Sequence, residues 1–207
     1  DLPKPIAIVN IGGVANITWI GEGEDNILAF DTGPGNALLD DWVRDHTGQH
    51  YDKNGAIAAS GTVDPQLIER FLAHSFFTAP APKSLDRNEF VGFARDLIAA
   101  RSLEDGAACL LHFTAAAIAA ARTHLPANPS QWLITGGGRL NHALMNLLQS
   151  QLGDVKPVET IGWNGDALEA EAFAFLAVRS LHGLPLSLPS TTGVRKPVTG
   201  GTLHNIK

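Results

Sequence analysis

The sequence predicts one α/β domain over residues 1–207, a mixed sheet flanked by helices, and three observations support this fold class. Short apolar runs rich in β-branched residues end in glycine-containing turns, and segments with helical periodicity follow them. This strand, turn and helix order occurs twice, over residues 27–48 and 132–152. No repeat of solenoid length and no low-complexity linker divides the chain. Strands that alternate with helices in this way are typical of a sheet covered by helices.

The N-terminal part is expected to form a three-stranded meander. Apolar runs at Ile6–Val9, Ala15–Ile20 and Ile27–Phe30 predict the strands, and the turn formers of Gly21–Asp25 predict a hairpin connection. Asn36 is suited to cap a helix that ends near Gly48.

The middle of the chain is expected to be helical. Asp64-Pro65 starts a helix that the proline-containing segment Ala79–Ser84 ends. A long helix over Leu103–His124 is apolar on more than one face, so we expect it to pack centrally.

The C-terminal part repeats the strand and helix order. Trp132–Thr135 predicts a buried strand, and Gly136–Asn141 leads into a helix that ends near Leu152. Val158–Ile161 is expected to be a further strand and Gly165–Ala177 a helix. The tail over Leu186–Lys207 is rich in Pro, Gly and Thr, so we expect it to be extended over the surface.

Composition excludes several classes of function. The net charge is −6, and no Lys/Arg cluster is longer than a pair, which argues against nucleic acid as a partner. Cys109 is the only cysteine, so an intrachain disulfide is impossible and a reducing compartment is favoured. The histidines have no metal-ligand spacing, and we predict no structural metal. The longest apolar stretch, Ala107–Ala121, is short for a membrane span, so we expect a soluble, cytoplasmic protein with no membrane partner.

Asp31 is the first candidate for catalysis. It follows the strand at Ile27–Phe30, where the backbone can hold a carboxylate rigidly against a ligand. The alternative is an Asx turn in which the carboxylate accepts the N–H groups of Thr32 and Gly33. Asp40 and Asp41 are expected to be solvated helix residues.

The glycine-containing turns are candidates for binding. Gly12 and Gly13 follow the first strand, and Gly136–Gly138 precedes a helix, where backbone N–H groups favour a polar or anionic ligand. The triplet matches neither GxGxxG nor a P-loop, so a tight turn without a ligand is the alternative. Asn10 and Asn16 flank the first turn, and ligand contact and turn stabilisation are equally compatible with them.

Five segments together resemble the anhydro-N-acetylmuramic acid kinase family. They are Asn10–Thr18, Phe30–Asn36, Pro82–Ser84, Ile134–Gly138 with Asn141, and Asp166–Ala170, in order over nearly the whole chain. The resemblance implies the actin-like (ASKHA, ribonuclease H-like) sugar-kinase fold, use of ATP and Mg²⁺, and an amino-sugar substrate. The 1,6-anhydro sugar would be opened by hydrolysis while its O6 is phosphorylated, in cell-wall recycling.

The resemblance also implies roles for individual residues. Asp31 would be the general base that deprotonates the attacking water. The ATP-binding residues would be Gly12, Gly13, Asn16, Gly136, Gly137, Gly138 and Asn141. The sugar-binding residues would be Asn10, Thr32, Gly33, Asn36 and Glu169.

One element of the family has no counterpart in the sequence, namely the N-terminal glycine-rich loop that grips ATP phosphates. The chain is therefore expected to be the C-terminal lobe of a longer, two-lobed kinase, nearly inactive alone because phosphoryl transfer needs charge neutralisation from several sides. The resemblance further implies a homodimer. The alternatives are another actin-like sugar kinase or acyl-phosphate-forming kinase, and a module that binds nucleotide without turnover.

Overall fold

A five-stranded mixed sheet with the order β3-β2-β1-β4-β5 forms the centre of the chain in the computed structural model, which describes residues 2–23 and 26–204. The strands are β1 (Ile6–Ile11), β2 (Val14–Ile20), β3 (Ile27–Pro34), β4 (Gln131–Thr135) and β5 (Val155–Pro157). β2 is antiparallel to β1 and β3, whereas β4 is parallel to β1 and β5 to β4. Only β2 runs against the others, which is the ribonuclease H-like arrangement of actin-like folds.

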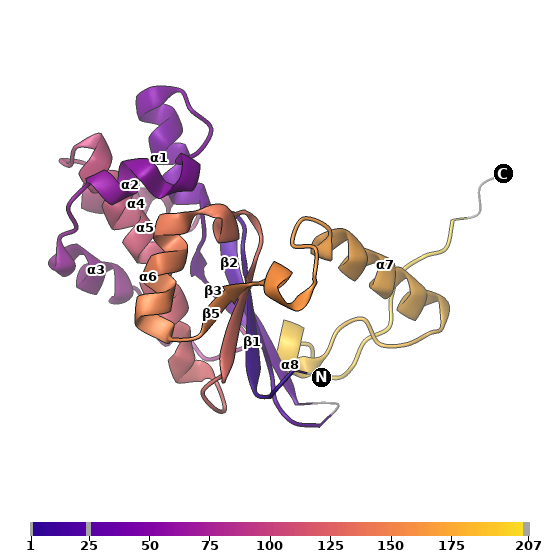
Figure 1. Cartoon of the computed structure of the whole chain (residues 1–207). Coiled ribbons are helices and arrows are strands. Elements are labelled where there is room, and N and C mark those ends of the chain that lie inside the picture. Colours follow the sequence, from indigo (N-terminus) through magenta and orange to yellow (C-terminus); the bar gives the residue numbers. More distant parts are fainter. Residues whose placement is uncertain (1, 24–25, 205–207) are drawn as a thin grey trace.

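Helices cover one face of this sheet (Figure 1). They are α1 (Ala37–Thr47), α2 (Ala56–Ser60), α3 (Pro65–Leu72), α4 (Val91–Ile98), α5 (Leu103–Ala120) and α6 (His142–Leu152). α5 lies at the centre of this layer and is buried along most of its length, as its apolar sequence predicts. The segment Leu103–His124 is long and apolar enough to cross a membrane, but 61% of its most apolar window is buried inside the protein. Its apolarity is explained by the core that it fills.

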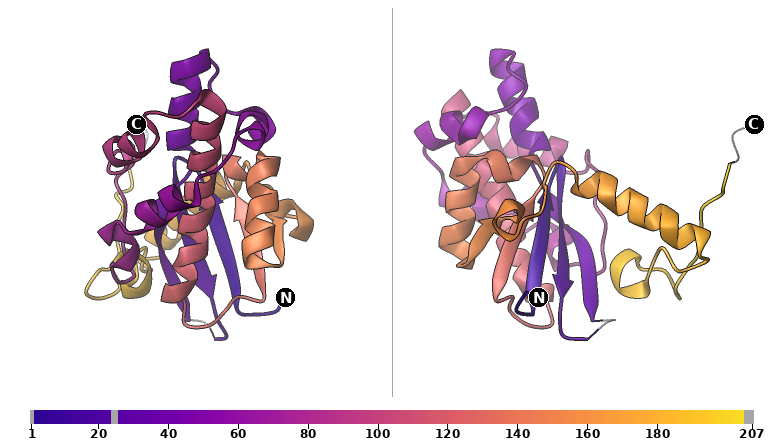
Figure 2. Two further views of the ribbon diagram at one scale, coloured as in Figure 1. Left: turned by 90° about the vertical axis from the view of Figure 1, so that its left-hand side faces the viewer. Right: turned by 45° about the vertical axis from the view of Figure 1, so that its right-hand side comes forward.

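The opposite face of the sheet is sparsely covered. A small cluster of Ile6, Leu133 and Val158 lies there. α7 (Leu168–Leu181) projects away from the sheet, and α8 (Pro189–Thr192) follows it (Figure 2). No residue of α7 is buried, so most of its apolar side chains face outward.

Most predicted elements are confirmed, and the exceptions have local causes. The meander, the helices after Asn36 and Asp64, and the central helix are present. The predicted strand at Val158–Ile161 is wrong, because this segment is the 3₁₀ turn η5 and the strand β5 ends at Pro157. Proline has no N–H to continue the pairing.

Other differences concern short elements and boundaries. The sequence did not predict α2 or α4, of five and eight residues. The helix expected at Gly165 begins at Leu168. The tail is not simply extended, since it contains α8 and a bridge between Ser187 and Val198. The predicted connection Gly21–Asp25 and the tail's end lie partly outside the described residues, at 24–25 and 205–207.

Candidate functional site

Four polar side chains form a row across the sheet. The register pairs Asp31 of β3 with Asn16 of β2, and Asn16 with Asn10 of β1. Asn10 is paired in turn with Thr135 of β4. Residues paired across strands present their side chains to the same face, and the next residue, Ile11, is buried in the core under the helices. This polar row (Asp31, Asn16, Asn10 and Thr135) therefore faces away from the helical layer.

A β-bulge positions Asp31 at the outer end of the polar row. The register shifts between Ala15 and Asn16, so that Thr32 becomes an extra residue in β3. Its hydroxyl donates to the carbonyl of Ala15, at 3.1 Å. Bulges change the direction of neighbouring side chains and are frequent next to active sites.

The segment after Pro82 runs along β3, and its backbone forms hydrogen bonds with Asp31. The N–H of Asp31 donates to the carbonyl of Lys83, at 2.9 Å. The N–H of Leu85 donates to Asp31 Oδ2, at 2.7 Å. Burial raises the pKa of Asp31 from its ordinary value of 3.8, and the hydrogen bond from Leu85 partly opposes this. Asp31 thus lies within a strand that continues to Pro34, and the Asx turn is not formed.

The turns that follow β1 and β4 come together at Asn36. The N–H of Asn36 donates to the carbonyl of Gly12, at 2.7 Å, and its amide nitrogen Nδ2 donates to the carbonyl of Ile11, at 3.2 Å. On the other side, a Cβ placed on Gly137 would lie 3.7 Å from Asn36 Nδ2. Asn36 is the N-cap residue of α1, as predicted, but its side chain joins the two turns instead of capping the helix.

The glycines of these turns differ in what requires them. Gly136 has φ of 74°, and a Cβ there would collide with Asn10 Oδ1 and the backbone of Ile11. For Gly12, Gly13 and Gly137, the atoms nearest to such a Cβ would lie 3.6 Å away or more. Packing therefore explains Gly136, whereas the other three leave backbone open to a ligand.

A cavity of about 570 Å³ adjoins this meeting point, within the usual size range of small-molecule sites. α1, the turn η1 (Lys53–Gly55), the turn η4 (Gly137–Leu140) and the start of α6 supply its walls. The lining residues are Asn36, Leu39, Asp40, Tyr51, Asp52, Lys53, Asn54, Gly137, Leu140, Asn141 and His142.

Asp40 belongs to this cavity wall, so the expectation of a solvated helix residue is wrong. Burial and the like charges of Asp41 and Asp52 raise its pKa to about 6, although the Arg44 and Arg87 guanidinium groups oppose them. The sequence signal for this position was the spacing of Asp40 from Asn36, since a residue four positions later lies on the same face of a helix.

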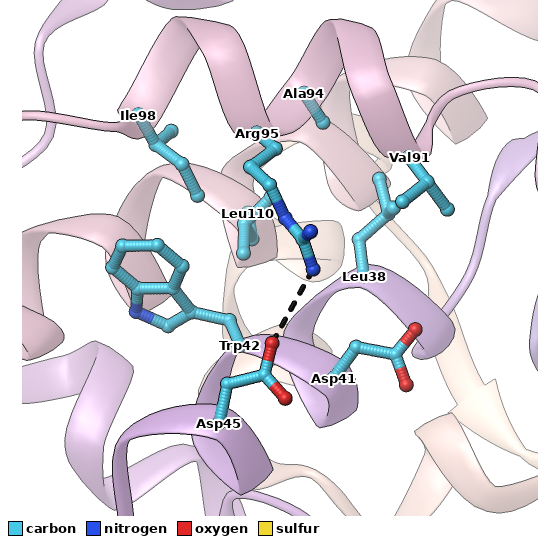
Figure 3. A pocket seen from close by; sticks show the side chains of 9 residues that line it. All are labelled: Leu38, Asp41, Trp42, Asp45, Val91, Ala94, Arg95, Ile98 and Leu110. Atoms are coloured by element: carbon cyan, nitrogen blue, oxygen red, sulfur yellow. Dashed lines mark hydrogen bonds and ion pairs between the residues drawn. The ribbon is translucent and has the colours of Figure 1, made fainter.

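A second hollow, between α1, α4 and α5, has a volume of only about 30 Å³ (Figure 3). The Arg95 and Asp45 side chains form an ion pair across it, at 3.3 Å. Its space is that of a single water molecule, so it is no site for a nucleotide or sugar.

A buried arginine joins the Gly136 turn to the segment that leads into α7. Arg139 has a side chain that is 5% exposed, and it forms ion pairs with Glu159 at 2.7 Å and with Asp166 at 2.6 Å. Its remaining amino group donates to the carbonyl of Gly136, at 2.9 Å. Asp166 thus pairs with Arg139, while Glu169 is exposed in the first turn of α7.

Three other predicted site residues have structural roles. Thr32 and Gly33 are buried, and a Cβ on Gly33 would meet Ala117 of the helical layer, at 2.8 Å. Asn141 lines the cavity, but its Oδ1 accepts the N–H of Leu144, at 3.0 Å, and so caps α6.

Among the described residues, no group of three or more His, Cys, Asp or Glu side chains is arranged to hold a metal ion.

Fold and site together define a ribonuclease H-like module whose candidate ligand site lies where the parallel strands β1 and β4 end. The family model described as anhydro-N-acetylmuramic acid kinase matches residues 1–205, and the chain belongs to that family.

Two relatives with that name illustrate the match. The protein of Rhodospirillum rubrum is 54% identical over 202 residues, which are 97% of this chain and 53% of the relative. The protein of Acidiphilium cryptum is 55% identical over 203 residues, which are 98% of this chain and 56% of the relative. The chain thus spans about half the length of these relatives.

Among solved structures, an activator of 2-hydroxyisocaproyl-CoA dehydratase from Clostridium difficile, with bound ADPNP, has a TM-score of 0.49 at 13% identity. The match covers 75% of this chain and 55% of that one.

Proposed function

We propose that the chain is one lobe of a two-lobed, ATP-dependent kinase that opens 1,6-anhydro-N-acetylmuramic acid and phosphorylates its O6. The product is N-acetylmuramic acid 6-phosphate, and the reaction belongs to cytoplasmic peptidoglycan recycling. Family membership supports the substrate. The observation that carries the chemistry is the polar row, which ends in Asp31 and lies beside two glycine turns and a cavity.

Each ligand is assigned to one part of the site. The nucleoside of ATP occupies the cavity, and its phosphates lie over the open backbone of Gly12, Gly13 and Gly137. The sugar lies on the polar row, where Asn10 and Asn16 offer hydrogen bonds to its hydroxyl and amide groups. The burial of Thr32 and Gly33 argues against direct contact of these two residues with the sugar.

Asp31 is the base in this proposal. Its carboxylate takes a proton from water, whose oxygen forms a bond to the anomeric carbon as the bond from that carbon to O6 breaks. The freed O6 takes the γ-phosphoryl group, and ADP leaves. Because burial raises the pKa of Asp31, the acidic limb of the rate profile is expected above pH 3.8.

Mg²⁺ would be held mainly by the ATP phosphates and several waters, as is usual for this ion. It would neutralise charge on the transferring group. The oxygen atoms of Asp31, Asn16 and Asn10, on β3, β2 and β1, suit a hard cation or its waters.

The second lobe corresponds in this proposal to the half of the relatives outside the match. α7 supports it, because the side chains of Phe173, Phe175 and Leu181 are 66%, 61% and 64% exposed. We propose that the other lobe packs against this helix. For the proposed homodimer, helix α5 offers little surface, because it is buried along most of its length.

The test uses the full-length protein that contains these residues, with ATP, Mg²⁺ and 1,6-anhydro-N-acetylmuramic acid. Mass spectrometry follows the sugar phosphate, and a coupled assay follows ADP. Asp31→Asn is expected to lower kcat by about 10³-fold or more, because base catalysis and water activation are both lost.

Asp45→Asn is the matched control. Asp45 is on α1, and its ion pair with Arg95 lies at the small hollow, so its substitution should leave kcat within about twofold. An Asp31→Asn protein that folds and keeps a tenth of the activity would exclude Asp31 as the base. Nucleotide binding without any sugar phosphate would favour a different substrate.

A further inference from the structure

We infer that Asp40 recognises the ribose of the bound nucleotide, its carboxylate accepting hydrogen bonds from the 2′- and 3′-hydroxyl groups. This inference rests on the proposed function, since it requires the nucleoside to occupy the cavity beside Asn36.

The Asp40 carboxylate is available to accept hydrogen bonds from a ligand. The other acidic residue of the wall, Asp52, uses both oxygens to accept the N–H groups of Ile57 and Ala58 at the start of α2, at 2.9 Å each. In the described part of the chain, no protein group donates a hydrogen bond to the Asp40 carboxylate. Asp40 is thus the acidic side chain of the wall that is left for a ligand.

Asp40 also lies at the position along the cavity where the ribose is expected. Asn36 and Gly137 lie at the glycine turns, where the phosphates are expected. Asp40 follows Asn36 by four residues, which is about 6 Å along α1. The ribose is the part of a nucleotide next to its phosphates. The base would extend further, toward the exposed ring of Tyr51.

The charge of the cavity wall also favours the ribose over the phosphates as the group beside Asp40. The cavity wall carries two carboxylates, those of Asp40 and Asp52, against the single ammonium group of Lys53, so on balance it disfavours phosphate groups and favours the uncharged part of the nucleotide. Ribose hydroxyls are neutral donors, and a hydrogen bond to an ionised acceptor is about twice as strong as one between neutral groups. A site built to bind these hydroxyls should reject an analogue that lacks one of them.

The experiment measures the affinity of the full-length protein for ATP, 2′-deoxy-ATP and 3′-deoxy-ATP. The wild type is expected to bind ATP about 10- to 100-fold more tightly than the weaker deoxy analogue, the usual worth of a hydrogen bond to a charged group. Asp40→Ala should reduce this ratio to about threefold or less, chiefly by weakening ATP binding. Asp40→Asn keeps one acceptor oxygen and should give an intermediate ratio.

Asp45→Ala is the control on the same helix and should keep the wild-type ratio, because Asp45 lines the other hollow. Thermal melting checks that each variant is folded. A folded Asp40→Ala protein with the wild-type ratio, or a wild type that binds both analogues as tightly as ATP, would overturn the inference while the kinase assay still supports the proposed function. A wild type that binds no ATP would overturn both.

Discussion

The two faces of the sheet differ in what they carry, an apolar core on one and a row of polar side chains on the other. On the covered face, Phe71 of α3 and Phe113 of α5 stack with ring centroids 4.1 Å apart, and both are fully buried. The other face carries the polar row and α7, which buries no residue. Polar side chains on a sheet lose hydration unless a ligand or water binds them, so they add little to folding. The covered face therefore contributes most to stability, whereas the polar row of the open face is exposed to ligands.

The largest expected effect compares phenylalanines on the two sides. Phe113→Ala should lower the free energy of unfolding by about 3–5 kcal/mol, because it leaves a cavity beside Phe71. Phe175→Ala should change it by less than about 0.5 kcal/mol in this chain, because the ring is 61% exposed. Urea unfolding of both variants measures the difference.

The same pair sharpens the proposal of a second lobe. If that lobe packs on α7, Phe175→Ala should become destabilising in the full-length protein while remaining neutral in residues 1–207. A large loss in the short chain would show that α7 contributes to its core, and the contrast between the two faces would be wrong.

A second comparison concerns the two glycine turns. Gly136→Ala should cost about 2–4 kcal/mol, because alanine is strained at φ of 74° and its methyl group would collide with Asn10. Gly13→Ala should leave the free energy of unfolding within about 0.5 kcal/mol, because its Cβ has room. Urea unfolding again measures both.

Gly13→Ala also serves as the functional half of this test. Its methyl group would stand between the backbone and the proposed phosphates, so ATP affinity of the full-length protein should fall although stability does not. Equal destabilisation by the two substitutions would mean that packing fixes both turns, and Gly13 would then give no support to a ligand site.

Local sequence signals predicted the larger elements of the fold. The meander, both strand, glycine and helix units, and the central helix are encoded by apolar periodicity together with caps such as Asp64. α2 was not predictable in this way, because its five residues depend on Asp52 accepting two of their N–H groups. The direction and order of the strands, which bring the Gly136 turn to Asn10, are also tertiary properties.

The site was less accessible to sequence reasoning, because it depends on register. Asp31, Asn16 and Asn10 were each singled out, but only the pairing of the strands joins them in one row. The bulge that buries Thr32 also has no clear local signal. Asp40 was assigned to solvent because leucines define the buried face of α1, whereas a helix that borders both a core and a cavity has two covered sides.

The smallest effect concerns Asp40 itself and its dependence on pH. Its pKa of about 6 in the folded protein lies above the ordinary value of 3.8, so the native state binds a proton more tightly than the unfolded chain. The free energy of unfolding that Asp40 contributes therefore decreases as the pH rises from 3.8 to about 6, and then stays constant. Asp40→Asn removes this decrease.

Asp40→Asn should accordingly raise the free energy of unfolding at pH 7.5 by about 1 kcal/mol, which corresponds to about 2–4 °C in Tm. This value is reduced for the partial exposure of the carboxyl group. The gain should shrink as the pH falls toward 4. Calorimetry of wild type and variant across this range measures it, with Asp45→Asn as the control on the same helix. A constant difference in Tm would show that Asp40 is neither buried nor held among like charges, and the cavity wall would then resemble an ordinary solvated helix face.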